Sequence, residues 1–290
     1  MFDMRYHIAS LVAVFIALAI GILLGTVIDD KGMLLQQQQS LVKRIETNFN
    51  TLRDENRTLK VELDEEKKLT SGVYPLSIMG RLDGQNVVVL ATSKKQNEML
   101  SVVVDGLSLA GATVGTVKVK EDFELTDEVK RELAAYLPQE MNDDNVRELV
   151  LKKLAEELVA TDTATAATTT TSPVVPYLSR LSELGLIVME TDASKSITSA
   201  LILGGTDGDL NPKTTDVHII AALKGTGIRV VGAENRECKK SYMKEYQQAG
   251  IPTVDNIDTQ AGIISAVFAL REANGNFGVK ATADQLVPKV

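Results

Sequence analysis

The sequence predicts an α/β protein that is joined by a coiled-coil stalk to an N-terminal transmembrane helix. Three features predict this class: a long uncharged run near the N-terminus, a heptad pattern after it, and an alternation of β-branched runs with helical patterns in the remainder. The predicted domains are residues 1–30 for the tail and membrane helix, 31–72 for the stalk, and 73–290 for a Rossmann-like, mostly parallel sheet flanked by helices.

The uncharged run extends from Ile8 to Ile28 and comprises 21 residues. A transmembrane helix needs roughly 20 apolar residues to cross a hydrocarbon core about 30 Å thick. A secretory signal peptide is the alternative, but its apolar region is usually about 7 to 15 residues long and ends at an Ala-x-Ala-like site. This run instead continues into Asp29 and Asp30. We therefore expect an uncleaved single span, whose flanking lysines and arginines leave its orientation open.

Small residues recur at every fourth position of the span, at Ala13, Ala17, Gly21 and Gly25. Such a stripe lets two membrane helices approach closely. The alternative is that alanine and glycine are simply common in membrane helices. Ala17, Gly21 and Gly25 are the candidate dimer contacts within the span.

Residues 35–70 follow a heptad pattern that is typical of a coiled coil. Position a is occupied by Leu35, Val42, Phe49, Asn56 and Leu63, and position d by Gln38, Ile45, Leu52, Leu59 and Glu66. A polar Asn56 at a favours two parallel strands in one register. The candidate stalk interface is therefore Val42, Ile45, Phe49, Leu52, Asn56, Leu59 and Leu63.

The residues that flank the heptad seam also favour a parallel homodimer. Glu55 at g would face Lys60 at e of a partner, and Glu62 would face Lys67. The alternative is an amphipathic helix packed on its own globular domain. As a coiled coil, the stalk would extend roughly 50 Å at 1.5 Å per residue.

Beyond residue 80, β-branched runs alternate with helical patterns, which predicts βαβ units. The expected strands are residues 86–91, 112–119, 186–189, 200–203 and 228–231. The expected helices are residues 94–110, 125–137, 143–160, 176–184, 215–223, 241–249 and 260–271. Thr126 is an expected N-cap, and Gly111, Gly225 and Gly250 are expected to end helices. The Thr- and Ala-rich residues 161–173 are expected to form a flexible connection.

The net charge and the cysteine content limit the possible partners and covalent crosslinks of the chain. The net charge of −8 argues against a nucleic-acid partner. Cys238 is the single cysteine, so no internal disulfide is possible. Two lysines follow Cys238 directly and are expected to lower the pKa of its thiol.

The glycine-rich stretch 204–209 is the strongest candidate for a ligand site. It follows an expected strand, where glycines allow close approach of the backbone to a phosphate. We therefore name Gly204, Gly205, Thr206 and Asp207 as candidate cofactor-binding residues. The stretch matches no nucleotide-binding motif, and the alternative is a tight turn built on Asp207 and the following glycine. Ser93, after the first strand, is an expected helix cap.

No constellation of catalytic or metal-ligating residues stands out. His7 lies beside the span and His218 lies in an apolar helical run, and Cys238 has no histidine or cysteine within four residues. The methionines are scattered, without the paired soft ligands that Cu(I) prefers. We therefore expect no metal site, no cofactor and no enzymatic activity.

Both ends of the chain resemble the bacterial copper transporter MctB family. The resemblance is carried by the opening "MFDMRYHIASLVAVFIALAIGILLG" and by three C-terminal blocks, "VDNIDT" from Val254, "GVKATA" from Gly278 and "LVP" from Leu286. It implies a role in copper homeostasis or transport, an N-terminus in the cytoplasm and a C-terminal domain outside it. Copper enters the expectations through this resemblance alone.

Two functions from different classes remain open at this point. The family name implies a transport component that limits copper accumulation, although one uncharged span offers no ion path and the sequence lacks the alternating strands of a membrane barrel. The family also includes the envelope protein SteB. That relationship implies a non-enzymatic dimeric scaffold that binds an envelope or cell-division partner.

Overall fold

The computed structural model divides into two compact units, Met1–Lys68 and Leu69–Val290. It describes residues 4–93, 96, 99–120, 123–138, 142, 145–159, 176–190, 197–207 and 211–289, without the side chains of residues 26–35. The expected flexible connection at residues 161–173 lies outside the described residues.

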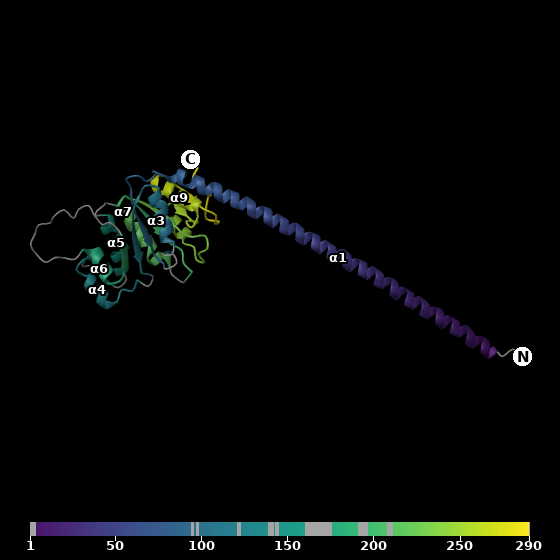
Figure 1. Cartoon of the computed structure of the whole chain (residues 1–290). Coiled ribbons are helices and arrows are strands. Elements are labelled where there is room, and N and C mark those ends of the chain that lie inside the picture. Colours follow the sequence, from purple (N-terminus) through teal and green to yellow (C-terminus); the bar gives the residue numbers. More distant parts are fainter. Residues whose placement is uncertain are drawn as a thin grey trace, which may run out of the picture. The chain divides into compact units, whose positions relative to one another are not determined.

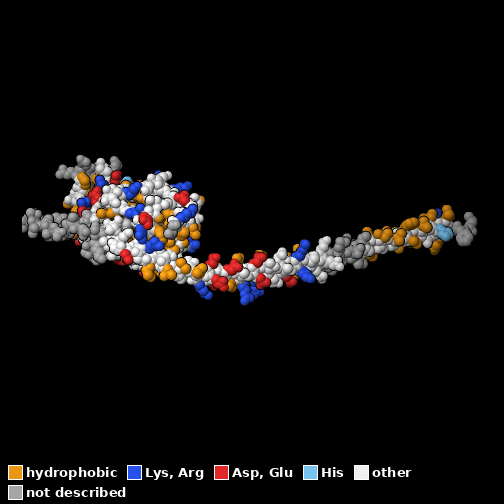
Figure 2. All heavy atoms as spheres, turned by 90° about the horizontal axis from the view of Figure 1, so that it is seen from above, with side chains coloured by type: hydrophobic (Ala, Val, Ile, Leu, Met, Phe, Trp, Pro, Cys, Tyr) orange, Lys and Arg blue, Asp and Glu red, His pale blue; other side chains and the backbone are white. Residues whose placement is uncertain are grey.

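One helix, α1 (Met4–Ile78), forms the whole described part of the first unit and continues into the second (Figure 1). Its segment Met4–Gly25 is long and apolar enough to cross a membrane, with a mean hydropathy of 2.8. Hydrophobic side chains cover this end of α1, whereas charged side chains of both signs lie along the stalk (Figure 2). The span and the stalk, predicted as separate segments, therefore belong to a single helix. Gly80, with φ of +70°, follows its C-terminal end.

The second unit is built on a seven-stranded sheet with the order β3-β2-β1-β4-β5-β6-β7. The strands are β1 (Asn86–Ala91), β2 (Thr113–Val119), β3 (Ile187–Glu190), β4 (Ser199–Leu203), β5 (Arg229–Ala233), β6 (Thr253–Val254) and β7 (Asn276–Phe277). All neighbouring pairs are parallel except β2 and β3. The predicted mostly parallel α/β sheet is confirmed, with β6 and β7 as additions.

Helices cover both faces of the sheet (Figure 1). They are α3 (Leu100–Leu109), α4 (Asp127–Leu133), α5 (Val146–Val159), α6 (Tyr177–Glu183), α7 (Asp216–Gly225), α8 (Met243–Gln248) and α9 (Gln260–Arg271), with a short 3₁₀ helix η1 (Pro212–Thr214). Alternate residues of β1 enter different cores: Val88 packs with α5 and α7, whereas Val89 packs with α3 and α9. The sheet is thus buried on both faces, which explains why its central strands are almost wholly apolar.

Most of the expected helix ends are found in the structure. The Thr126 side chain accepts a hydrogen bond from Val129 N at the start of α4. Gly111 and Gly250 adopt positive φ after α3 and α8. The expectation for Gly225 was wrong, because it is the last residue of α7 and Gly227 adopts the left-handed conformation, with φ of +85°. The two glycines are only two residues apart, so composition alone could not distinguish them.

Candidate functional site at the carboxyl edge of the sheet

The sheet order places β1 beside β4, and the chain winds in opposite directions from these two strands. In open α/β sheets, ligands bind at such a switch point, beyond the carboxyl ends of the strands. Ser93 Oγ and Gln96 Nε2, which follow β1, both donate hydrogen bonds to the carbonyl oxygen of Gly205, at 3.2 and 3.0 Å. Both side chains are buried, and α3 begins only at Leu100 without a side-chain cap. Ser93 therefore joins the loops that follow β1 and β4.

The two candidate glycines are required by close packing against other parts of the protein. A Cβ atom on Gly204 would lie 2.0 Å from Tyr246 Oη. Gly205 has φ of +76°, and its Cβ would lie 3.0 Å from Cys238 Sγ and 3.1 Å from Glu234 Oε2. Other groups do come close to the backbone of these two glycines, as the sequence suggested. These groups are the ring of Tyr246 and the loop after β5.

Thr206 and Asp207, the other two candidates, also contact the loop after β5. Thr206 and Lys240 exchange backbone hydrogen bonds in both directions, at 3.1 and 2.9 Å. Asp207 Oδ1 accepts a hydrogen bond from Lys239 N at 3.1 Å. The stretch 204–207 and the loop after β5 are therefore held together at one edge of the sheet.

Glu234, the residue directly after β5, accepts several hydrogen bonds at this edge of the sheet. Its side chain is fully buried, and Oε1 accepts hydrogen bonds from Ser241 Oγ and Lys280 Nζ, each at 2.6 Å. Its other oxygen accepts from Tyr242 N at 2.8 Å. Burial alone would lower the pKa of Lys280, but its bonds to Glu234 and Cys238 leave that pKa raised. The structure thus holds a charged pair inside the protein, where each carboxylate oxygen has a donor.

Cys238 lies against this pair, with its sulfur 3.1 Å from Lys280 Nζ. Burial, followed by the charge of Glu234, raises the pKa of the thiol, and the opposing effect of Lys280 is smaller. The expectation that neighbouring lysines lower this pKa was wrong. The reason is that the sequence neighbours Lys239 and Lys240 are exposed, whereas the carboxylate of Glu234 lies close to the sulfur.

Asp255 connects two of the C-terminal sequence blocks. Its buried carboxylate accepts hydrogen bonds from Val279 N at 2.7 Å and Lys280 N at 3.0 Å. Gly278, with φ of +137°, allows this approach, because a Cβ there would lie 1.9 Å from Asp255 Oδ1. The carboxylate therefore fixes the backbone from which Lys280 reaches Glu234.

A third buried carboxyl group, Asp216, lies in the first turn of α7. Its Oδ2 accepts hydrogen bonds from the Tyr246 hydroxyl and, at 3.3 Å, from Thr92 Oγ1. Burial raises the pKa of Asp216 from 3.8 to about 7, against the opposing effect of these two bonds. This carboxyl group can therefore change its protonation near neutral pH.

The candidate residues named from the sequence thus lie in separate parts of the structure. Within the part of the chain that the structure describes, no group of three or more His, Cys, Asp or Glu side chains is arranged to hold a metal ion. His7 lies on α1 and His218 on α7. Sequence reasoning missed Glu234, Asp255 and Lys280. The sequence did offer signals for these residues. Glu234 is a charged residue directly after the β-branched run of β5, and Asp255 and Lys280 lie in the C-terminal blocks.

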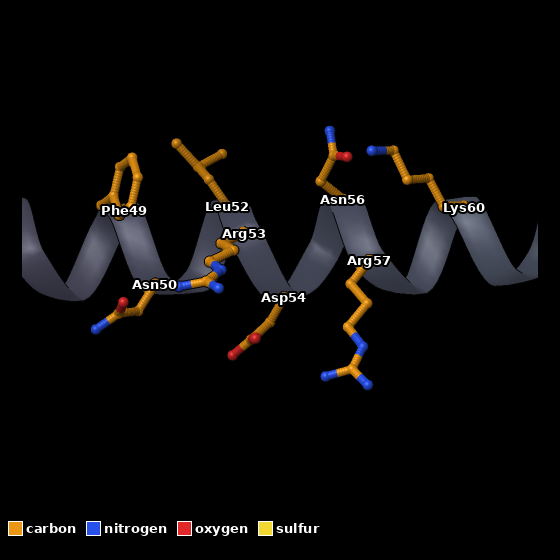
Figure 3. Close-up of a pocket in the computed structure, with 8 residues that line it drawn as sticks. All are labelled: Phe49, Asn50, Leu52, Arg53, Asp54, Asn56, Arg57 and Lys60. Atoms are coloured by element: carbon orange, nitrogen blue, oxygen red, sulfur yellow. The ribbon is translucent and has the colours of Figure 1, made fainter.

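The predicted dimer residues all lie on α1 and are exposed on the single chain. The apolar side chains at positions a and d are between 50% and 65% exposed; they are Val42, Ile45, Phe49, Leu52, Leu59 and Leu63. Figure 3 shows the side chains of this region of α1. Phe49, Leu52 and Asn56 point to one side of the helix, and Asn50, Asp54 and Arg57 point to the other.

Comparison with known proteins identifies the family. The family described as "Copper transport outer membrane protein, MctB" matches residues 1–288. The chain belongs to the MctB family. Proteins named copper transporter MctB from Mycobacterium bovis and Mycobacterium tuberculosis are 25% identical to it, over 94% of this chain and 93% of theirs.

Membership in the MctB family confirms the resemblance seen at both ends of the sequence. It assigns the chain to a family related to copper transport and supports a membrane location together with the apolar segment Met4–Gly25. Two of the C-terminal blocks meet in space, because Asp255 from one binds the backbone of Val279 and Lys280 in another.

Proposed function

We propose that this member of the MctB family is a single-pass membrane protein of the cell envelope that acts in copper homeostasis. The family match over residues 1–288 carries the proposal, because it includes the apolar segment of α1 as well as the α/β unit. The relatives named copper transporter MctB match over nearly the same length. In this proposal, copper is the substrate of the transport system to which the protein belongs.

The proposal includes an orientation in which the N-terminus is cytoplasmic and the α/β unit lies outside the cytoplasm. This orientation is the one that the resemblance to the MctB family implies. The α/β unit must then lie on the opposite side from the N-terminus, because the structure offers one candidate span in its described residues.

Deletion of the gene tests this function. We expect the deletion strain to grow less well in added copper and to contain more copper per cell, with no change in its zinc tolerance. The full chain should restore both properties, whereas residues 35–290, which lack the membrane segment, should not. Unchanged copper tolerance and copper content in the deletion strain would contradict the proposal.

A second candidate function, a dimeric scaffold for an envelope or cell-division protein, is favoured by the exposed apolar seam of α1. Such a stripe on a polar helix is typical of a protein–protein contact. Purification of the tagged full chain from detergent-solubilised cells tests it. A stoichiometric second protein that still co-purifies with the α/β unit after mild crosslinking would favour this function. Recovery of the chain alone would count against it.

A further inference from the structure

The seam of α1 in the stalk is an exposed apolar surface. The a and d side chains from Val42 to Leu63 form one stripe, and each apolar member is at least half exposed. Asn56 is the polar member of this stripe and points to the same side as Phe49 and Leu52 (Figure 3). An apolar stripe with one central asparagine is typical of a helix that pairs with another helix in a fixed register.

The charges beside the seam identify a second copy of the chain as the partner. Position g carries Glu55 and Glu62, whereas position e carries Glu46, Arg53, Lys60 and Lys67, and only Glu46 departs from the basic character of e. In a parallel pair, each g residue faces the e residue five positions later on the partner, so both glutamates face lysines. In an antiparallel pair, g faces g and e faces e, which would bring like charges together. The surface is therefore complementary to itself in the parallel arrangement.

The same face continues into the membrane segment. The backbone of α1 is helical without a break from Met4 to Ile78. Gly21 precedes Val42 by 21 residues, which is three heptads, so Gly21 falls at position a. Ala17 then falls at position d, and Ala13 and Gly25 occupy the flanking positions g and e. The small residues of the span and the apolar residues of the stalk thus share one face in heptad counting.

We propose that two copies of this chain associate in parallel along α1, through a face that includes Ala17 and Gly21 in the membrane and the seam from Val42 to Leu63 in the stalk. Insertion of both chains in the same orientation gives the parallel arrangement that the stalk charges require. The proposal is independent of the role in copper homeostasis, since it rests on α1 alone.

Cysteine crosslinking of the full chain in membranes tests both parts of the interface. In a Cys238→Ser background, Asn56→Cys (position a) is compared with Asn50→Cys (position b), whose side chain points to the opposite side (Figure 3). In the span, Ala17→Cys at d is compared with Ala19→Cys at f. These pairs replace the same residue type on opposite faces. Equal residue numbers meet only in a parallel pair, so disulfide-linked dimers are expected from the a and d variants and not from their controls.

Three crosslinking results would overturn the proposal. Equal crosslinking of each variant and its control would indicate random collision. Failure of Asn56→Cys to crosslink would remove the stalk interface. Crosslinking of Asn56→Cys without Ala17→Cys would remove the part of the interface in the membrane.

A charge reversal gives a second measurement. Glu55→Lys with Glu62→Lys should weaken dimerisation of the full chain in detergent by about tenfold, because four attractions in the dimer become repulsions. Adding Lys60→Glu and Lys67→Glu on the same chain should restore it. Sedimentation analysis measures the dissociation constant. A chain that remains monomeric at all concentrations, or a reversal without effect, would contradict the proposal.

Discussion

Asp216 makes the stability of the α/β unit depend on pH. Its pKa of about 7 lies above the ordinary value of 3.8, so the folded state holds this proton when the unfolded state has already lost it. The free energy of unfolding should therefore fall as the pH rises from about 4 to 7, by up to about 4 kcal/mol. Below pH 4 the protonated Asp216 makes its full contribution to stability, and above pH 7 this contribution is lost.

Asp216→Asn tests this pH dependence, because the amide oxygen can still accept the Tyr246 hydroxyl. Denaturant unfolding of the full chain in detergent, followed by near-ultraviolet circular dichroism, should show a flatter pH profile for the variant. Asp54→Asn, which alters an exposed residue of α1, should leave the profile unchanged. A variant as pH-sensitive as the original protein would show that Asp216 titrates normally.

Gly278 should tolerate no side chain. Gly278→Ala would place a methyl group against Asp255 Oδ1 and would hold alanine at a φ of +137°, so we expect a loss of about 3 kcal/mol. Gly225→Ala is the matched control, because no atom lies within 4 Å of its added Cβ and no strained φ is involved. Thermal unfolding of both variants measures the difference. Equal melting temperatures would contradict the role of Gly278 in the Asp255 contact.

At the level of single residues, local features were predictable and contacts between distant segments were not. Thr126 was recognised as an N-cap because a cap depends on residues within one turn. The packing of Gly204 against Tyr246 and the effect of Glu234 on Cys238 depend on the fold, which brings different loops together. The same limit hid Asp255 and Lys280, although both stand in blocks already noticed for their resemblance.

Lys280, in the segment after β7, binds Glu234, the residue that follows β5. This contact gives a prediction for how the segment is held. Lys280→Met would leave the buried Glu234 without its ammonium partner and should cost about 3 kcal/mol. Arg236→Met removes a half-exposed partner of Asp258 and should cost less than about 1 kcal/mol.

A double variant separates loss of the ion pair from loss of packing. Glu234→Gln combined with Lys280→Met removes both charges, so it should recover part of the stability that Lys280→Met loses. Denaturant unfolding of the three proteins measures the recovery. A double variant less stable than the single one by the full cost of Glu234→Gln would show that the two groups act independently.

The elements that sequence could define are those long enough to show a period. The five predicted strands correspond to β1–β5 within one or two residues at each end. The strands β6 and β7 comprise two residues each, which is too short for any alternation to be recognised. They form by pairing onto β5 and onto each other, so their existence depends on the completed sheet.

Across the whole molecule, the orientation in the membrane remains a prediction, and a single engineered thiol can test it. Ser182 is exposed on α6, and Ser182→Cys in a Cys238→Ser background provides one reactive site in the α/β unit. We expect a membrane-impermeant maleimide to label it on intact spheroplasts. The reverse result, labelling only after lysis, would place the α/β unit in the cytoplasm. Asp3→Cys at the N-terminal tail should behave in the opposite way.

At this scale the sequence determined the class of the protein from its longest patterns. The uncharged run predicted the segment that could span a membrane, and the alternation of strands and helices predicted the doubly covered sheet. The continuity of the span with the stalk was not predicted, because the boundary between them was placed at the acidic residues Asp29 and Asp30. Neighbouring apolar and polar turns can nevertheless propagate as one helix.

The junction of Lys280 with Glu234 also has a consequence for biosynthesis. Glu234 directly follows β5, yet its cation is supplied 46 residues later. During synthesis the carboxylate must therefore remain hydrated until residues 278–280 have emerged and docked on Asp255. A chain that stops short of residue 278 would keep the carboxylate of Glu234 without its ammonium partner. Closure of the pair is therefore a late step of folding, because Lys280 follows Glu234 by 46 residues.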